Sequence, residues 1–190
     1  MKVPSLREAE LSNSVPYLRS VVGALFAGWV LYKERRYAAI CFPYHGRPLS
    51  QPVLSDATYV RGFTDIFRSL RLLHNASVCH RDVSRENIVV DDDGNCRLID
   101  FGRALKYEPR TDTRHRQFQT DRYYDCQNLF YAFVYTQGLL EGRHRWIRIL
   151  DDRTRAEWDQ YVHTLSGDKW PEVYIPSRGW HILHPLFGIP

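Results

Sequence analysis

Apolar positions recur every three or four residues between Asp56 and Ala76, which is the spacing of one face of an α-helix. The apolar side chains on this face are Val60, Phe63, Phe67, Leu70 and Leu73. Ser55 or Asp56 could cap the first turn, because both side chains carry oxygens that accept hydrogen bonds from free backbone N–H groups. The pattern therefore predicts a long amphipathic helix over residues 56–76.

Two short β-rich runs follow, residues 88–90 and 96–99, separated by the acidic turn 91–95 with its Asp-Gly step. This is the strongest local signal for a β-hairpin. Because a hairpin brings its two ends together, Asn87 before the first strand and Asp100 after the second are expected to lie side by side.

Strands are also predicted over residues 27–32 and 37–42, separated by the charged turn 33–36. The stretch 43–48, which contains two prolines and a glycine, interrupts regular structure and is typical of a hinge.

Further helices are predicted over residues 6–14 and 125–137. Another begins with the capping-box sequence Thr-Arg-Ala-Glu at Thr154 and is stopped by Gly167. No internal repeat or domain boundary is visible, so the elements predict a single domain of α+β class.

Composition is ordinary for a globular protein of 190 residues, at 44% hydrophobic, 25% charged and 14% aromatic. The net charge of +4 is too small to predict nucleic-acid binding. The four cysteines form no CxxC pair, so neither a zinc site nor a disulfide framework is expected. The most apolar run, residues 21–32, is shorter than the roughly 20 residues of a membrane-spanning helix. We expect an intracellular protein, cytoplasmic or nuclear, without a membrane partner or signal peptide.

The candidate chemistry lies between Cys79 and Ala104. This segment contains, in order, His80-Arg81-Asp82, Asn87 and Asp100-Phe101-Gly102. The residues and their spacing resemble the catalytic core of the protein kinase family. The resemblance implies one kinase-like domain over residues 1–190. It would have a reduced N-terminal lobe and hinge over 1–45, with one helix and about two strands, and a mainly helical C-terminal lobe over 46–190.

The resemblance assigns Asp82 the role of catalytic base, and Asn87 and Asp100 the role of Mg2+ ligands. His80 and Arg81 match the supporting pair in the same loop. Amide and carboxylate oxygens are the ligands that Mg2+ prefers, and a positioned Asp can accept the proton of an incoming hydroxyl. The implied cofactors are ATP and Mg2+, and the implied acceptor is a Ser or Thr of a protein substrate.

The sequence CFPYHGRPL, from Cys41 to Leu49, resembles the strand-to-hinge segment that contacts adenine through its backbone. This resemblance places Phe42 and Tyr44 at the nucleotide. Ser84 stands where most serine/threonine kinases have Lys, and the loop HRDVSRENI is most similar to fungal-type kinase-like sequences.

Asp125 resembles the acidic residue that anchors the catalytic loop in this family, and a plain helix N-cap is the alternative. In the family, the Arg equivalent to Arg81 commonly holds a phosphorylated residue. Thr113 is the best-placed candidate for that phosphorylation, and an exposed polar loop is the alternative.

Three family features are missing from the chain. It has no glycine-rich loop, no Ala-Pro-Glu motif between Gly102 and Asp125, and only Lys2 as a possible phosphate-clamping lysine. The function expected is therefore an ATP-dependent, kinase-like phosphotransferase, and two alternatives stay open. One is a pseudokinase or truncated kinase lobe that binds a protein partner. The other is a small-molecule kinase, although such enzymes usually have Gly at the position of Arg81.

Overall fold

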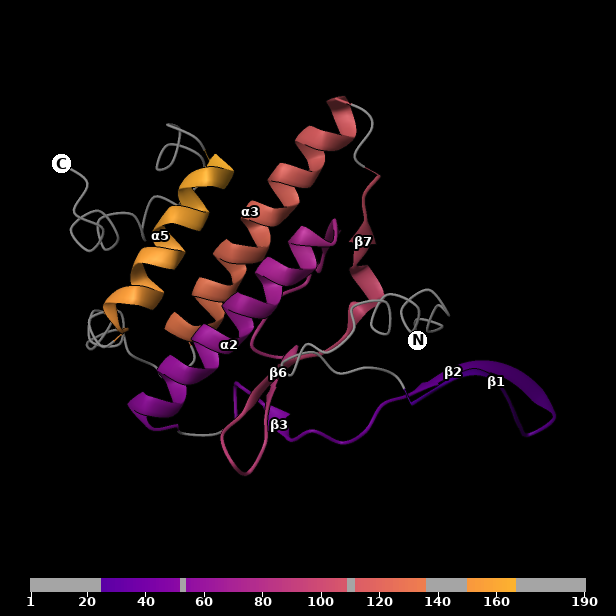
Figure 1. Cartoon of the computed structure of the whole chain (residues 1–190). Coiled ribbons are helices and arrows are strands. Elements are labelled where there is room, and N and C mark those ends of the chain that lie inside the picture. The colour runs from indigo at the N-terminus through magenta and orange to yellow at the C-terminus, as the bar shows by residue number, and fades with distance from the viewer. Residues whose placement is uncertain (1–24, 52–53, 109–111, 136–149, 167–190) are drawn as a thin grey trace.

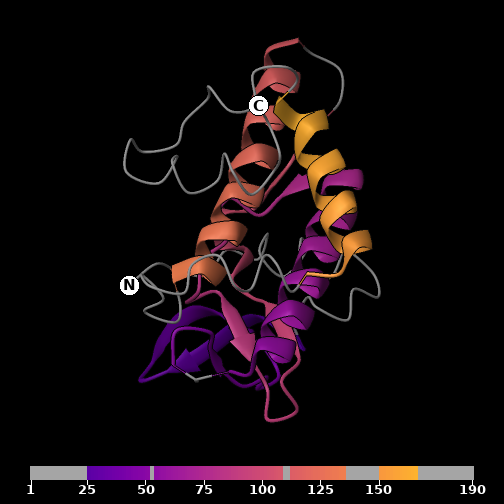
Figure 2. The ribbon, with the colours of Figure 1, turned by 90° about the vertical axis from the view of Figure 1, so that its left-hand side faces the viewer.

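The computed structural model describes residues 25–51, 54–108, 112–135 and 150–166. Three helices form the body of this described part: α2 (Asp56–Asn75), α3 (Asp112–Tyr135) and α5 (Asp152–Ser166). Helix α3 packs against both α2 and α5, while short antiparallel strands lie beside them (Figure 1). The view turned by 90° shows the same grouping of helices, with the strands gathered at one end (Figure 2).

The amphipathic helix predicted over residues 56–76 is confirmed as α2. Ser55 is its N-cap, and the Ser55 Oγ accepts a hydrogen bond of 3.2 Å from the backbone N–H of Thr58. The predicted apolar face is buried against the other elements. The largest fully buried apolar side chains of the described residues are Phe63, Phe67, Phe101, Phe133, Leu49, Ile66, Leu70, Leu73, Ile88, Leu98 and Leu129.

The strands predicted near the start of the chain are confirmed as β1 (Phe26–Tyr32) and β2 (Arg35–Cys41), which pair antiparallel. Their turn is shorter than predicted, since it contains only Lys33 and Glu34, at φ of 46° and 63°. Positive φ at both positions matches the twist of a two-residue hairpin turn. The hairpin extends away from the helices (Figure 1).

The second predicted hairpin is confirmed as β5 (Ile88–Val90) and β6 (Cys96–Leu98). Strand β3 (Arg47–Pro48) joins this sheet by pairing with β5, and β4 (Val78–Cys79) pairs with β7 (Leu105–Lys106). These three two-residue strands were not predicted, because their only signal is pairing between distant segments.

Helix α3 corrects one prediction, since it begins at Asp112 and not at Asp125. Its first half lacks an apolar period, because its side chains face polar groups of the catalytic loop. Helix α5 corrects another: Asp151 caps it, and its carboxylate accepts from the backbone N–H and the hydroxyl of Thr154, each at 2.8 Å. Thr154 is therefore the third residue of the helix and not its cap. The helix predicted over residues 6–14 lies outside the described residues.

None of the helices in the described part of the chain has both the length and the apolar composition that crossing a membrane requires. All four cysteines lie in the described ranges and are free thiols; Cys79, Cys96 and Cys126 are buried, and Cys41 is exposed.

Candidate active site

The loop that links β4 to β5 begins with His80, which is completely buried. Its Nε2–H donates to the carbonyl oxygen of Ile99 over 3.0 Å, and its ring meets the ring of Phe101 edge to face, with centroids 4.8 Å apart. Burial lowers the pKa of His80 and outweighs the carboxylate of Asp125, which acts to raise it. The neutral ring therefore joins the start of the loop to the segment around Asp100.

Three printed contacts connect the candidate catalytic residues. The Asn87 side-chain N–H donates to the backbone oxygen of Asp82 over 2.8 Å, and the backbone oxygen of Asn87 accepts from the N–H of Ile99 over 2.9 Å. The third contact joins the Asp82 carboxylate to Arg103. The hairpin thus brings the backbone of Asn87 beside the residue that precedes Asp100, as the strand pattern predicts.

The oxygen atoms of Asn87 and Asp100 suit a hard cation. Because Asn87 directs its amide nitrogen to Asp82, its amide oxygen is the group that it can offer to a metal. Asp100 is exposed, has a left-handed backbone with φ of 63°, and uses one carboxylate oxygen to accept from the N–H of Gly102 over 3.1 Å. An amide and a carboxylate oxygen are a donor set that fits Mg2+.

Asp82, the candidate base, is partly exposed, with 33% of its side-chain surface accessible. One of its carboxylate oxygens lies 3.2 Å from the guanidinium of Arg103, on the 3-10 turn Phe101–Arg103. Arg103 was not singled out from the sequence, since nothing local indicates that it folds back onto Asp82.

Asp125 lies in the middle of α3, so the N-cap alternative is wrong. Its fully buried carboxylate accepts from the backbone N–H of His80 over 2.8 Å and from that of Arg81 over 2.7 Å. Arg81 has a φ of 66°, a conformation that costs a non-glycine residue free energy and persists only where neighbours hold it. These hydrogen bonds hold the backbone immediately before Asp82.

The side chain of Arg81 contacts the carboxylate of Asp121 on α3, with Nε and Oδ2 3.1 Å apart. Asp121 also accepts from the hydroxyl of Tyr107 and, over 2.8 Å, from the side-chain amide of Gln117. The backbone of Thr113 lies in the first turn of α3 and not in a loop. Arg81 therefore already has an acidic partner, and phosphorylation of Thr113 stays a prediction.

Phe42 and Tyr44 lie in the segment that connects β2 to β3. Phe42 is partly buried, whereas Tyr44 is 83% exposed. Their backbone contact with adenine stays a prediction.

His74, Cys79 and Asp125 place potential metal ligands within 4.8 Å of one another. The Asp125 oxygens already accept from backbone N–H groups, and burial raises the pKa of the Cys79 thiol. Because a metal needs the thiolate, this cluster supports the loop rather than a metal. Sequence reasoning missed His74, although a polar residue beside the apolar face of a helix is a signal for a buried hydrogen bond.

A model of the family described as protein kinase domain matches residues 34–129, half of the chain. The match covers β2, α2, the loop with Asp82 and the start of α3. The chain belongs to the protein kinase family.

Individual relatives match shorter parts. A probable serine/threonine-protein kinase KIN1 homolog of Encephalitozoon cuniculi is 33% identical over 86 residues, which is 43% of this chain and 15% of that protein. The CTD kinase subunit alpha of Saccharomyces cerevisiae is 27% identical over 93 residues, 46% of this chain and 18% of that protein. The protein kinase gsk3 of Schizosaccharomyces pombe is 31% identical over 101 residues, 50% of this chain and 24% of that protein. The chain thus spans at most about a quarter of these relatives.

Proposed function

We propose that the chain acts as a protein kinase that binds ATP with Mg2+ and directs phosphoryl transfer to Ser or Thr of a protein substrate. The observation that carries the proposal is the connection of Asp82, Asn87 and the Asp100 segment through hydrogen bonds of 2.8 and 2.9 Å. The match to the protein kinase domain and the names of the relatives support it.

Each residue has a defined part in this proposal. Asp82 orients the acceptor hydroxyl and takes its proton, while Asn87 and Asp100 offer oxygens to the metal. Mg2+, when bound, supplies positive charge against the phosphate oxygens. Asp125 holds the backbone of His80 and Arg81, so the Asp82 carboxylate stays in place relative to the metal ligands. The segment with Phe42 and Tyr44 would contact adenine. The free thiols suit a reducing compartment, so we place the protein in the cytoplasm or nucleus.

The proposal is tested with three matched Asp→Asn variants. Asp82→Asn should retain the thermal shift caused by millimolar Mg–ATP but lose phosphoryl transfer to casein. Asp100→Asn should lose most of the Mg2+-dependent part of that shift. Asp92→Asn, at an exposed turn position away from the loop, should behave as the original chain. Absence of any shift with the original chain, or transfer by Asp82→Asn at the original rate, would overturn the proposal.

A second candidate function is a pseudokinase that acts as a protein-interaction module. The β1–β2 hairpin favours it, because Leu25, Trp29 and Leu31 are 71%, 64% and 73% exposed. Exposed apolar groups of this size often mark an interaction surface. The module is favoured if Mg–ATP causes no thermal shift while Trp29→Ser reduces binding to a copurifying protein. No feature of the described residues favours the small-molecule alternative.

A further inference from the structure

A buried chain of hydrogen bonds joins α5 to the catalytic loop through α2 and α3. The hydroxyl of Tyr161 on α5 lies 2.7 Å from Nδ1 of His74 on α2, and Nε2 of His74 lies 3.0 Å from the Asp125 carboxylate. His74 and Asp125 are 2% and 0% exposed, and Tyr161 is 8% exposed. Arg122 of α3 also reaches the Tyr161 oxygen, with Nη2 3.1 Å away.

The two ends of this chain determine where its hydrogens lie. Arg122 can only donate, so the Tyr161 oxygen accepts from it. The ionised carboxylate of Asp125 can only accept, so Nε2 of His74 carries a hydrogen and donates it. The remaining bond then runs from the Tyr161 O–H to Nδ1 of His74. The geometry therefore selects one tautomer of His74, with hydrogen on Nε2.

The same carboxylate oxygen of Asp125 that accepts from His74 also accepts from the backbone N–H of His80 over 2.8 Å. The other oxygen accepts from the N–H of Arg81, whose φ is 66°. The orientation of the Asp125 carboxylate thus bears directly on the residues that precede Asp82.

We propose that Tyr161 and Arg122 are positioning residues for the catalytic loop. They hold His74 in one tautomer, which holds the Asp125 carboxylate, which in turn holds the backbone before Asp82. The effect on phosphoryl transfer rests on the proposed function, whereas the effect on the loop does not. Helix α5, which contributes no residue to the recognised motifs, becomes part of the support of the site.

Removal of one hydroxyl is a clean test, because the Tyr161 ring has its own contacts. It stacks on the His74 ring with centroids 6.0 Å apart, and the guanidinium groups of Arg71 and Arg122 each lie 5.4 Å from its centroid. Tyr161→Phe keeps this ring and removes only the hydrogen bonds. Tyr123→Phe, a buried tyrosine of α3 that contacts neither His74 nor Asp125 in these hydrogen bonds, is the matched control.

The first readout does not depend on activity. Nitrogen-15 NMR of the original chain should show His74 with hydrogen on Nε2 and not on Nδ1. In Tyr161→Phe, amide hydrogen exchange at His80 and Arg81 should accelerate at least about tenfold, as expected when local opening becomes easier. Tyr123→Phe should leave it unchanged. Hydrogen on Nδ1 of His74, or unchanged exchange in Tyr161→Phe, would overturn the proposal.

The second readout is kinetic, with Mg–ATP and casein. Tyr161→Phe should lower kcat roughly tenfold and leave the KM for ATP within about twofold, because misplacement of a catalytic group acts on the chemical step. An original chain without transfer would overturn the proposed function, while the exchange data would still decide the positioning role. If Tyr161→Phe does not fold, Arg122→Gln provides the variant, and the tautomer of the original chain decides independently.

Discussion

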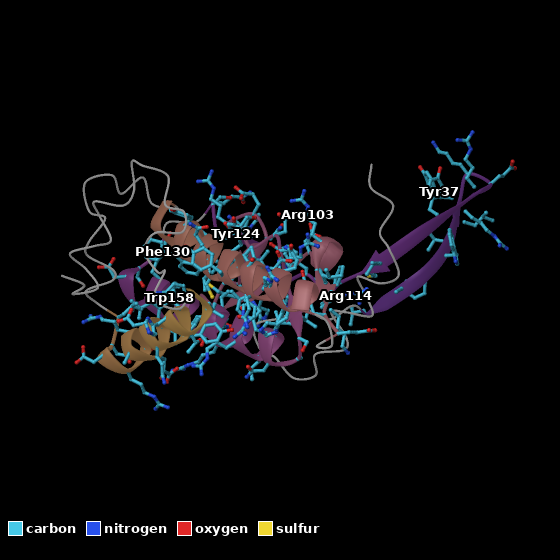
Figure 3. The ribbon with its side chains drawn as sticks, turned by 90° about the horizontal axis from the view of Figure 1, so that it is seen from above. Tyr37, Arg103, Arg114, Tyr124, Phe130 and Trp158 are labelled. Carbon is cyan, nitrogen blue, oxygen red and sulfur yellow. The ribbon has the colours of Figure 1, made fainter. Side chains whose placement is uncertain are left out.

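The helical body and the β1–β2 hairpin both carry large aromatic side chains, but the body buries them and the hairpin exposes them. Phe67 in α2 is 0% exposed and its ring lies 5.0 Å from that of Trp158. Trp29 and Tyr32 in the hairpin are 64% and 61% exposed. In the view from above, the labelled Tyr37 on the hairpin lies far from Trp158 on α5 (Figure 3). A two-stranded hairpin is marginally stable by itself, so the body carries the stability of the described part, and the hairpin offers a surface.

The largest difference should appear between two Phe→Ala variants. Phe67→Ala removes a fully buried ring and should lower the free energy of unfolding by about 3–5 kcal/mol. Phe26→Ala, at a position that is 49% exposed, should change it by less than about 0.5 kcal/mol. Urea unfolding followed by circular dichroism measures both. Similar losses in the two variants would show that the hairpin is packed in solution.

Gly46, between the hairpin and the body, should be the next most sensitive position. It has a φ of 114°, and an added Cβ would overlap the backbone of Val90 in β5. Gly46→Ala should therefore lower the free energy of unfolding by about 1–3 kcal/mol through backbone strain. Ala57→Gly, at an exposed position in the first turn of α2, is a control for the helix side. A neutral Gly46→Ala would mean that β3 does not pair with β5 as described.

Acid should act on the turn between β5 and β6. Partial burial acts to raise the pKa of Asp91, but hydrogen bonds from Asn95 and Arg97 outweigh it and lower the pKa to about 2. A folded-state pKa below the unfolded value of about 3.9 contributes stability that is present above pH 4 and is lost as the pH falls toward 2. The contribution should be about 1–2 kcal/mol.

Thermal unfolding of the original chain and of Asp91→Asn, measured between pH 5 and pH 2, checks this. The variant should be less stable at pH 5, and the difference should shrink toward pH 2. A constant difference across this range would contradict the low pKa of Asp91.

The smallest effect on stability is expected in the hairpin. Leu31→Ser, at a position that is 73% exposed, should change the free energy of unfolding by less than about 0.5 kcal/mol. It should nevertheless reduce the binding of a hydrophobic dye, because it removes exposed apolar surface. Unchanged dye fluorescence would indicate that this surface is covered by another part of the protein.

Local patterns account for the elements that were predicted well. The apolar spacing of α2 and the Asp-Gly turn between β5 and β6 each depend on neighbours in the sequence, so their positions could be assigned without a structure. The same hairpin predicted that Asn87 and Asp100 lie together, and the bond between Asn87 and Ile99 agrees with this. The start of α3 was missed, because its first residues are polar on a side that contacts the catalytic loop.

The sequence by itself determined the family and the set of candidate catalytic residues, since the spacing of His80, Asp82, Asn87 and Asp100 is a local property. The tertiary structure decided which partners hold them: Asp121 for Arg81, Arg103 for Asp82, and Tyr161 through His74 for Asp125. Each of these contacts joins residues from separate elements. Such pairing depends on how the helices pack, and no periodicity or motif within the chain records it.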